Sequence, residues 1–176
     1  MQIVEQPDIF LREPTSEVKF PLSSEDQVII DQMIDVMKRN NGIGLAANQV
    51  GYARRIFVMD VSPGRSKPQV FINPVIEKKA AEKLTEEEGC LSCQKQLVEV
   101  RRPIYVGLKW TCRHGKEQYK TFYYLASRIV QHEMDHLNGK LIIDKDFLEE
   151  AEKEKEELND SYRESVRQAT ERNKRV

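Results

Sequence analysis

The sequence predicts an α+β fold in which mixed, mostly antiparallel β-sheets pack around one central helix. Apolar residues recur at helical spacing within 24–40 and again within 125–137. The segments 97–101, 104–111 and 118–123 are rich in β-branched and aromatic residues, which favours strands joined as hairpins. A chain of 176 residues is long enough to bury the core of one such domain.

The first element along the chain is predicted to be a helix that faces the core. Residues 1–21 are interrupted by prolines and are expected to be irregular. Ser23 and Ser24 are candidate N-caps, and the acidic side chains that follow suit a first turn. The apolar periodicity then predicts a helix over 24–40, which the run Asn40-Asn41-Gly42 ends.

Two strands and a connection are expected in the middle of the chain. The small residues of the segment 42–49, GIGLAANQ, allow another group to approach the backbone closely. Residues 56–61 and 70–76 are predicted strands. The polar stretch 77–88 is predicted to be mostly a solvated connection.

A hairpin and a second helix follow. His114-Gly115 lies where a hairpin turn between the last two strands is expected. The second helix should end at Asn138-Gly139. Tyr123 has no short side-chain acceptor for the start of this helix, so the start is expected to be either distorted or capped by Thr121.

Composition excludes several classes of function. The formal net charge of −1 gives no general attraction to DNA or to an anionic membrane. No apolar run reaches the roughly 20 residues that a membrane-spanning helix requires. The first residues resemble neither a secretory signal nor a transit peptide. Three cysteines, an odd number, argue against a disulfide framework and favour a reducing cytoplasm.

The motif His132-Glu133-x-x-His136 is the strongest functional signal in the chain. Residues four apart lie on one face of a helix, so the two imidazoles can bind one metal ion with Glu133 beside them. A catalytic metal site usually has three protein ligands and one open position. The residues alone leave the third ligand open. The candidates are the acidic side chains and Cys90, Cys93, Cys112 and His114.

Three blocks in this order resemble the signatures of the peptide deformylases. They are GIGLAANQ at 42–49, EGCLS at 88–92 and QHEMDH at 131–136, and they match the family patterns G-x-G-x-A-A-x-Q, E-G-C-x-S and H-E-x-D-H. The similarity covers roughly residues 5–146. The resemblance implies a metal-dependent hydrolase that removes the N-formyl group from the initiator methionine of nascent polypeptides, giving formate and a free N-terminus.

The resemblance also implies roles for individual residues. Cys90, His132 and His136 correspond to the metal ligands, and Glu133 corresponds to the general acid/base. The family also has an oxyanion site and a substrate groove. The oxyanion donors correspond to the side chain of Gln49 and the backbone N–H of Leu91. The residues that contact the peptide correspond to Ile43, Gly44, Leu125, Arg128 and Ile129.

The implied cofactor is one divalent metal ion. Ferrous iron is the usual metal of the family, and a site with a thiolate ligand also suits Zn(II), Ni(II) or Co(II). Asp135 lies between the ligands on the helix and is expected to support the site or pack the helix rather than bind metal. Ser92 and Arg101 or Arg102 are candidates to orient the cysteine loop.

The domain boundary is placed after residue 146. Residues 1–146 form the predicted catalytic metallohydrolase domain, and residues 147–176 form a polar C-terminal helical extension. Family members with a long C-terminal helix use it to dock at the ribosome, so the basic end of this tail is a candidate for contact with RNA phosphates. The protein is otherwise expected to be a cytoplasmic monomer.

The sequence departs from the family at two places. After EGCLS the family often continues Val-Pro-Gly, whereas this chain has Cys93-Gln94-Lys95, which alters the rim of the substrate groove. Near the start of the second helix the family usually has Gly at 124 and Ala at 127, whereas this chain has Tyr124 and Ser127. Neither departure removes an implied catalytic residue.

Four other interpretations compete with this one. A structural zinc ribbon would use Cys90, Cys93, Cys112 and His114, but it leaves the two helical histidines without a role. A dinucleotide site at 42–47 would require a preceding strand and a following helix. An endopeptidase normally takes a His or Glu as third ligand. A ribosome-binding protein with a vestigial site would bind ribosomes without turnover.

Overall fold

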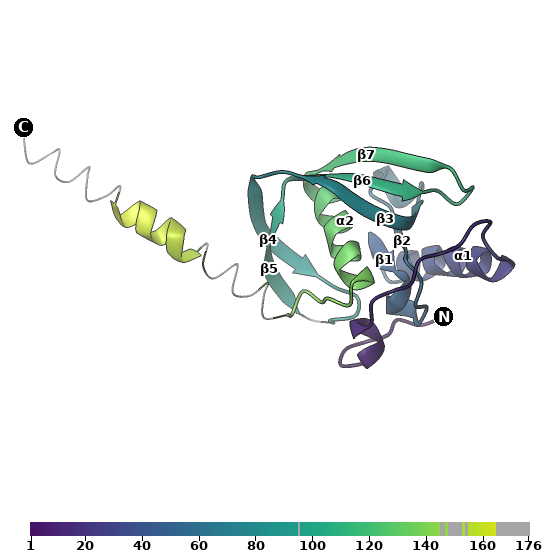
Figure 1. Ribbon diagram of the computed structural model, residues 1–176. Coiled ribbons are helices and arrows are strands. Elements are labelled where there is room, and N and C mark those ends of the chain that lie inside the picture. Colours follow the sequence, from purple (N-terminus) through teal and green to yellow (C-terminus); the bar gives the residue numbers. More distant parts are fainter. Residues whose placement is uncertain (95, 145–146, 148–152, 154, 165–176) are drawn as a thin grey trace, which may run out of the picture.

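A computed structural model of the chain describes residues 1–94, 96–144, 147, 153 and 155–164 (Figure 1). It has an α+β fold, as predicted, with one five-stranded and one two-stranded antiparallel sheet. The elements in chain order are the 3-10 helix η1 (Ile9–Arg12), α1 (Ser24–Arg39), β1 (Gly44–Ala46), η2 (Ala47–Val50), β2 (Ile56–Met59), η3 (Pro63–Arg65), β3 (Gln69–Lys79), β4 (Lys83–Gly89), β5 (Leu97–Pro103), β6 (Tyr105–Thr111), β7 (Glu117–Tyr123) and α2 (Tyr124–Leu137).

The five-stranded sheet, in the order β1-β2-β3-β6-β7, packs against α2 on one face, and α1 covers β1 and β2 on the other. Successive side chains of β2 point to opposite faces of the sheet. Ile56 and Val58 pack with α1 in one apolar cluster, and Phe57 and Met59 pack with α2 in another. Strand β2 is therefore apolar at every position, because neither of its faces meets water.

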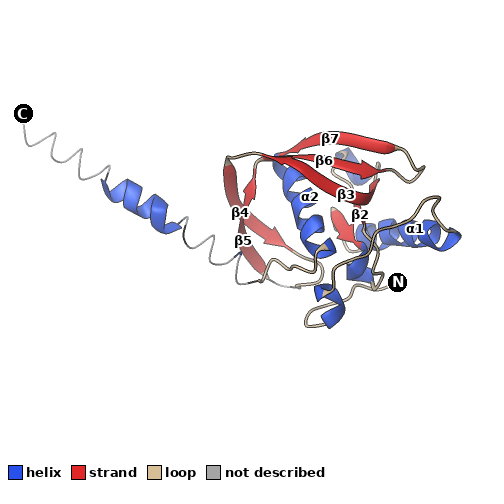
Figure 2. Cartoon of the chain, in the orientation of Figure 1, coloured by secondary structure: helices blue, strands red, loops and turns tan. Residues whose placement is uncertain are grey.

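Helix α2 lies between the five-stranded sheet and the β4-β5 hairpin, with α1 on the far side of β1 and β2 (Figure 2). Its apolar side contributes Ile129, Val130, Met134 and Leu137 to the core. This arrangement surrounds the helix that carries the H-E-x-x-H motif, and it leaves one face of the helix toward β4.

Helix α1 begins as the sequence predicted. Ser23 is the N-cap, and its hydroxyl accepts a hydrogen bond from the N–H of Asp26 at 3.0 Å. The carboxylate of Asp26 accepts in return from the N–H of Ser23 at 3.0 Å, which completes a capping box. The two groups satisfy helix-end donors that would otherwise have no partner.

The prediction that residues 77–88 form a solvated connection was wrong. Glu77 to Lys79 continue β3, and Lys83–Gly89 is the separate strand β4, which pairs in full register with β5. The stretch lacks an apolar alternation because β4 buries only Glu88, and arginines rather than apolar groups compensate that residue. Periodicity of apolar residues cannot reveal a strand of this kind.

The start of α2 is distorted, which was one of the two expected outcomes. No side chain caps the helix at Tyr123, so capping by Thr121 was wrong. Tyr124 has a φ of 49°, in the left-handed region that L residues seldom adopt. This conformation explains physically why a glycine suits the position.

The end of α2 agrees with the prediction at Asn138-Gly139. Gly139 has a φ of 72°, and a Cβ at this position would lie 2.2 Å from the carbonyl oxygen of Arg12. Only glycine allows the N-terminal segment to pass so close to the helix end.

The predicted tail helix lies mostly outside the described residues. Residues 155–164 are helical and exposed, and Lys155 forms an ion pair with Glu99 of β5. Among the described residues, no helix has the length and apolarity needed to cross a membrane.

Candidate metal centre

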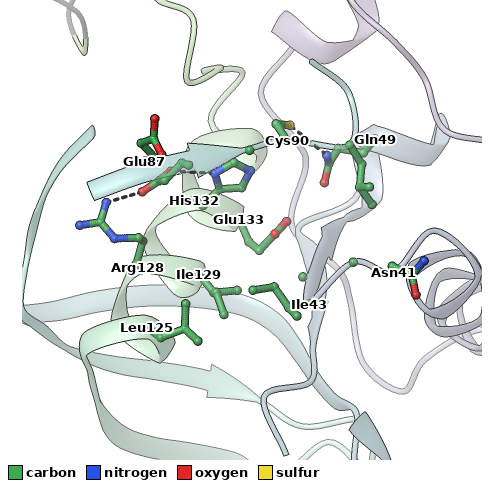
Figure 3. Close-up of a pocket in the computed structure, with 15 residues that line it drawn as sticks. Asn41, Ile43, Gln49, Glu87, Cys90, Leu125, Arg128, Ile129, His132 and Glu133 are labelled. Atoms are coloured by element: carbon green, nitrogen blue, oxygen red, sulfur yellow. Dashed lines mark hydrogen bonds and ion pairs between the residues drawn. The ribbon is translucent and has the colours of Figure 1, made fainter. Parts of the chain in front are cut away.

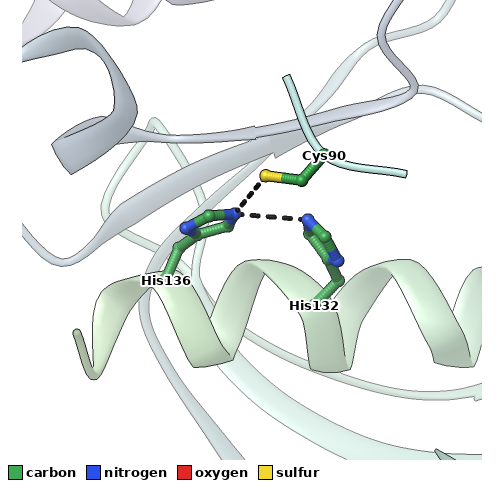
Figure 4. Close-up of side chains that lie close together, drawn as sticks. All are labelled: Cys90, His132 and His136. Atoms are coloured by element: carbon green, nitrogen blue, oxygen red, sulfur yellow. Dashed lines mark hydrogen bonds between the residues drawn. The ribbon is translucent and has the colours of Figure 1, made fainter. Parts of the chain in front are cut away.

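The three implied metal ligands converge on one point (Figure 4). The Nε2 atom of His136 lies 3.2 Å from the Nε2 atom of His132 and 3.2 Å from the Sγ atom of Cys90. Donor atoms around a tetrahedral ion, with bonds of ~2.0–2.3 Å, lie about 3.3–3.6 Å apart. Two of the three spacings are close to these values and all three donor atoms lie within 4.8 Å of one another, so the donor set fits a divalent transition metal.

The polypeptide brings Cys90 to the helix from a distant part of the chain. Strand β4 runs alongside α2 and ends at Gly89, and Cys90 is the next residue. The N–H of Cys93 donates to the carbonyl of Cys90 at 3.1 Å, so residues 90–93 form a tight turn. The turn directs the Cys90 sulfur toward His136.

Glu88 is a site residue that sequence reasoning missed, although it is the first residue of the EGCLS block. Its Oε2 atom lies 3.0 Å from Nδ1 of His132. Its two oxygens accept hydrogen bonds from Arg102 at 2.6 and 2.9 Å, and Oε1 accepts another from Arg128 at 2.8 Å. With Nδ1–H donating to Glu88, the Nε2 lone pair of His132 is free for a metal.

Arg102 links this carboxylate to Asp135, which lies about one helical turn after His132. Its Nη1 atom donates to Asp135 at 2.6 Å, and only 5% of the residue is exposed. Asp135 thus supports the helix rather than offering a ligand, as expected. Of the two candidate arginines, Arg102 orients the strand that leads to Cys90.

Burial and neighbouring charges shift the pKa values of this cluster in different directions. Burial raises the pKa of Glu88, but hydrogen bonds from Arg102 and His132 outweigh it and hold the pKa far below its usual range. Burial lowers the pKa of His132, but the bond to Glu88 outweighs it and raises the net value. Burial, followed by repulsion from His132, lowers the pKa of His136.

Glu133 points into the space beside the ligands and lies against β1. A Cβ on Gly44 would lie 2.3 Å from the Oε1 atom of Glu133, so a glycine is required for this approach. Among the described residues, the Oε2 atom of Glu133 is buried without a hydrogen-bond partner. Burial raises the pKa of Glu133 to about 7. A carboxyl group in this state can both accept and donate a proton near neutral pH.

Gln49 is held in a fixed orientation next to Cys90. Its Oε1 atom accepts from the N–H of Ala46 at 2.8 Å, which turns its amide nitrogen toward the site. That nitrogen lies 3.2 Å from the hydroxyl of Ser92 and 3.6 Å from the Cys90 sulfur. Ser92, named from the sequence as a possible orienting residue, therefore contacts Gln49.

A cavity of about 420 Å³ opens beside the ligands (Figure 3). The residues implied to contact the peptide all line it: Ile43, Gly44, Leu125, Arg128 and Ile129. Leu91 lines it as well. Arg128 forms part of the wall, since its guanidinium is engaged by Glu86, Glu88 and two backbone carbonyls.

The zinc-ribbon interpretation is wrong for this structure. Among the described residues, one group of three or more side chains could hold a metal ion, and it contains neither Cys93, Cys112 nor His114. The dinucleotide interpretation is also wrong, because residues 44–50 form the short strand β1 and the 3-10 helix η2.

The comparison with known proteins identifies the family. The family model described as polypeptide deformylase matches residues 1–157. This chain belongs to the peptide deformylase family. It is therefore a metal-dependent hydrolase that removes the formyl group from formylated nascent peptides.

Related deformylases from diverse sources support the same assignment. The peptide deformylase of Zymomonas mobilis is 42% identical over 150 residues, which span 82% of this chain and 84% of the relative. The crystal structure of the Thermotoga maritima peptide deformylase matches with a TM-score of 0.76 and 39% identity, over 81% of this chain and 95% of that one. A probable peptide deformylase from Synechococcus phage S-SSM7 matches with a TM-score of 0.77 and 37% identity, over 83% and 98% of the two chains.

Proposed function

We propose that Cys90, His132 and His136 hold the catalytic metal ion and that Glu133 is the general acid/base of deformylation. The convergence of the three donor atoms beside a cavity is the observation that carries this proposal. A divalent cation bound there would supply the Lewis acidity that polarises water and the formyl carbonyl at neutral pH.

The formyl group would meet Glu133 and Gln49 on opposite sides of the reacting carbon. The Glu133 carboxylate would take the proton of the attacking water and later deliver it to the leaving amine. The amide nitrogen of Gln49 would donate to the carbonyl oxygen as it gains negative charge. Among the described residues, the backbone N–H of Leu91 has no hydrogen-bond acceptor, so it is available as a second donor.

The cavity and the adjoining strand would bind the peptide. The apolar side chains of Ile43, Leu125 and Ile129 suit the methionine side chain. Strand β1 is an edge strand of the five-stranded sheet, so the backbone at Gly44, and at Ile43 just before the strand, can pair with an extended substrate. The free edge of the sheet thus positions the formyl end at the metal.

The direct test is turnover of a formyl-methionyl tripeptide by metal-loaded protein. We expect Glu133→Gln to lower kcat by roughly 10²–10⁴-fold with its metal retained. Glu77→Gln, an exposed change on β3, is the matched control and should keep full activity. An unformylated peptide should stay intact. Cleavage of an internal bond would favour the endopeptidase interpretation, and full activity of Glu133→Gln would contradict the assigned role.

We also propose ferrous iron as the physiological metal, because it is the usual metal of the family and is compatible with a donor set of one thiolate and two imidazoles. Equal turnover by zinc- and iron-loaded protein would contradict a preference for iron. The chain is proposed to act as a monomer in the cytoplasm.

The polar tail is proposed to contact the ribosome. Arg163 lies at the exposed end of the described helical residues, and Arg167, Arg172, Lys174 and Arg175 follow in the sequence. Pelleting with ribosomes at rising salt should show weaker binding after removal of residues 161–176. Equal binding by the two forms would end this proposal. Ribosome binding by a protein without any turnover would instead favour the vestigial-site interpretation.

A further inference from the structure

Cys90 is followed three residues later by a second cysteine that the proposed reaction does not use. Cys93 is fully buried and packs with Leu11 and Leu141, while Cys90 lies partly buried against this cluster. The N–H of Cys93 donates to the carbonyl of Cys90 at 3.1 Å, so the two cysteines stand at the two ends of one tight turn.

The turn that carries both residues has the geometry of a disulfide loop. A turn closed by the hydrogen bond from Cys93 N–H to Cys90 C=O brings the two Cα atoms within about 7 Å. Disulfides usually join Cα atoms ~4.4–6.8 Å apart. The backbone therefore needs little rearrangement to form the bond.

The two thiols differ in their access to an oxidant. Cys90 lines both the substrate cavity and a second cavity bordered by Met1, Glu5 and Arg39. Cys93 has no exposed surface. An accessible thiol beside a buried one is the arrangement in which the first is oxidised and the second resolves the product.

We propose that Cys90 and Cys93 form a reversible disulfide when the protein meets a peroxide. The Cys90 sulfur attacks a peroxide oxygen, the O–O bond breaks, and the other oxygen leaves as hydroxide, which takes up a proton from the thiol or, for a thiolate, from solvent to become water. The Cys93 sulfur then attacks the resulting sulfenic acid, the S–S bond forms, and the hydroxyl leaves as a second water. The two thiols lose two electrons, and the peroxide gains them.

The modification protects the sulfur while it disables the metal centre. A sulfur in a disulfide no longer serves as a thiolate ligand, so the metal is released. This consequence rests on the ligand set proposed above, whereas formation of the disulfide does not. Without Cys93, the sulfenic acid of Cys90 proceeds to sulfinic and sulfonic acids, which thiols do not reverse.

The test treats the full zinc-loaded chain with hydrogen peroxide, since zinc itself is not oxidised. One tryptic peptide, residues 84–95, carries both cysteines, and Cys112 falls in another peptide. We expect the 84–95 peptide to lose the mass of two hydrogen atoms, a chromogenic chelator to detect released zinc, and dithiothreitol to restore zinc binding.

Two variants decide between this modification and ordinary oxidative damage. Cys93→Val keeps an apolar side chain of similar size in the buried position, and its peptide should instead gain two or three oxygen atoms, with zinc binding lost permanently. Cys112→Ser is the matched control and should behave as the unsubstituted chain. Oxygen addition without a disulfide in the unsubstituted chain, or full recovery by Cys93→Val, would overturn the proposal. A disulfide that forms while zinc stays bound would support the modification and refute Cys90 as a ligand.

Discussion

The two sheets hold helix α2 by different kinds of interaction. The five-stranded sheet packs Phe57, Phe71 and Phe122 against the apolar side of the helix. The β4-β5 hairpin instead contacts it through buried ion pairs centred on Glu88. The apolar face supplies free energy without fixing orientation, since the hydrophobic effect is non-directional. The ionic face fixes the orientation of His132 and Cys90 at a desolvation cost.

The largest expected effect comes from a substitution in the five-stranded sheet, which holds α2 by apolar contacts. Phe71 is fully buried and stacks on Phe57 with ring centroids 4.4 Å apart. Phe71→Ala should lower the free energy of unfolding by ~3–5 kcal/mol in a denaturant titration, because it removes apolar contacts and leaves a cavity. The metal affinity of the folded variant should stay unchanged. Val75→Ala, an exposed change on the same strand, is the control and should have little effect.

A comparable but smaller loss is expected on the ionic side. Arg102→Ala leaves the buried carboxylate of Glu88 with fewer partners and removes the link to Asp135. We expect a loss of about 3 kcal/mol in unfolding free energy, together with weaker metal binding. A variant that lost stability but bound metal normally would show that the pair does not orient the site.

Glu88→Gln most clearly separates the role of the β4-β5 hairpin from that of the five-stranded sheet. The change retains the shape of the side chain but weakens the contact that holds Nδ1 of His132. Metal affinity should fall ~10–100-fold in a competition titration with a chelator. The same titration on Phe71→Ala provides the contrast, and equal affinities for the two variants would remove the distinction between the sheets.

The smallest expected effect lies at the capping box of α1. This helix packs on the five-stranded sheet, and its capping box is far from the metal ligands. Ser23→Ala should cost about 1 kcal/mol of unfolding free energy at pH 7. Burial raises the pKa of Asp26, but hydrogen bonds from Ser23 and Tyr52 outweigh it and lower the net value.

The pH dependence of this deficit has a definite sign. A folded-state pKa below the unfolded value stabilises the protein above the unfolded pKa, and this contribution disappears as pH falls through the folded pKa. The difference between Ser23→Ala and the unsubstituted chain should therefore shrink below about pH 4. Unfolding curves between pH 7 and pH 3 measure it, and a deficit that grew on acidification would contradict the assignment.

The sequence by itself determined the features that depend on interactions between residues a few positions apart. The cap at Ser23, the helix stop at Gly139 and the histidine pair of α2 follow from hydrogen-bonding groups, backbone conformation and helical spacing, which act over one or two turns. Matching of the three sequence blocks also pointed to Cys90 as the partner of the two histidines, which spacing alone left open.

Tertiary structure alone decided the role of the charged residues between those blocks. Strand β4 is polar because Glu88 faces α2 and is neutralised by Arg102 and Arg128, which come from a different strand and a helix. The packing of Cys93 with Leu11 and Leu141, and the close approach of Glu133 to Gly44, likewise depend on how separate segments pack. A buried charge is stable only beside its partners, and those partners are defined by the fold rather than by neighbouring positions in the sequence.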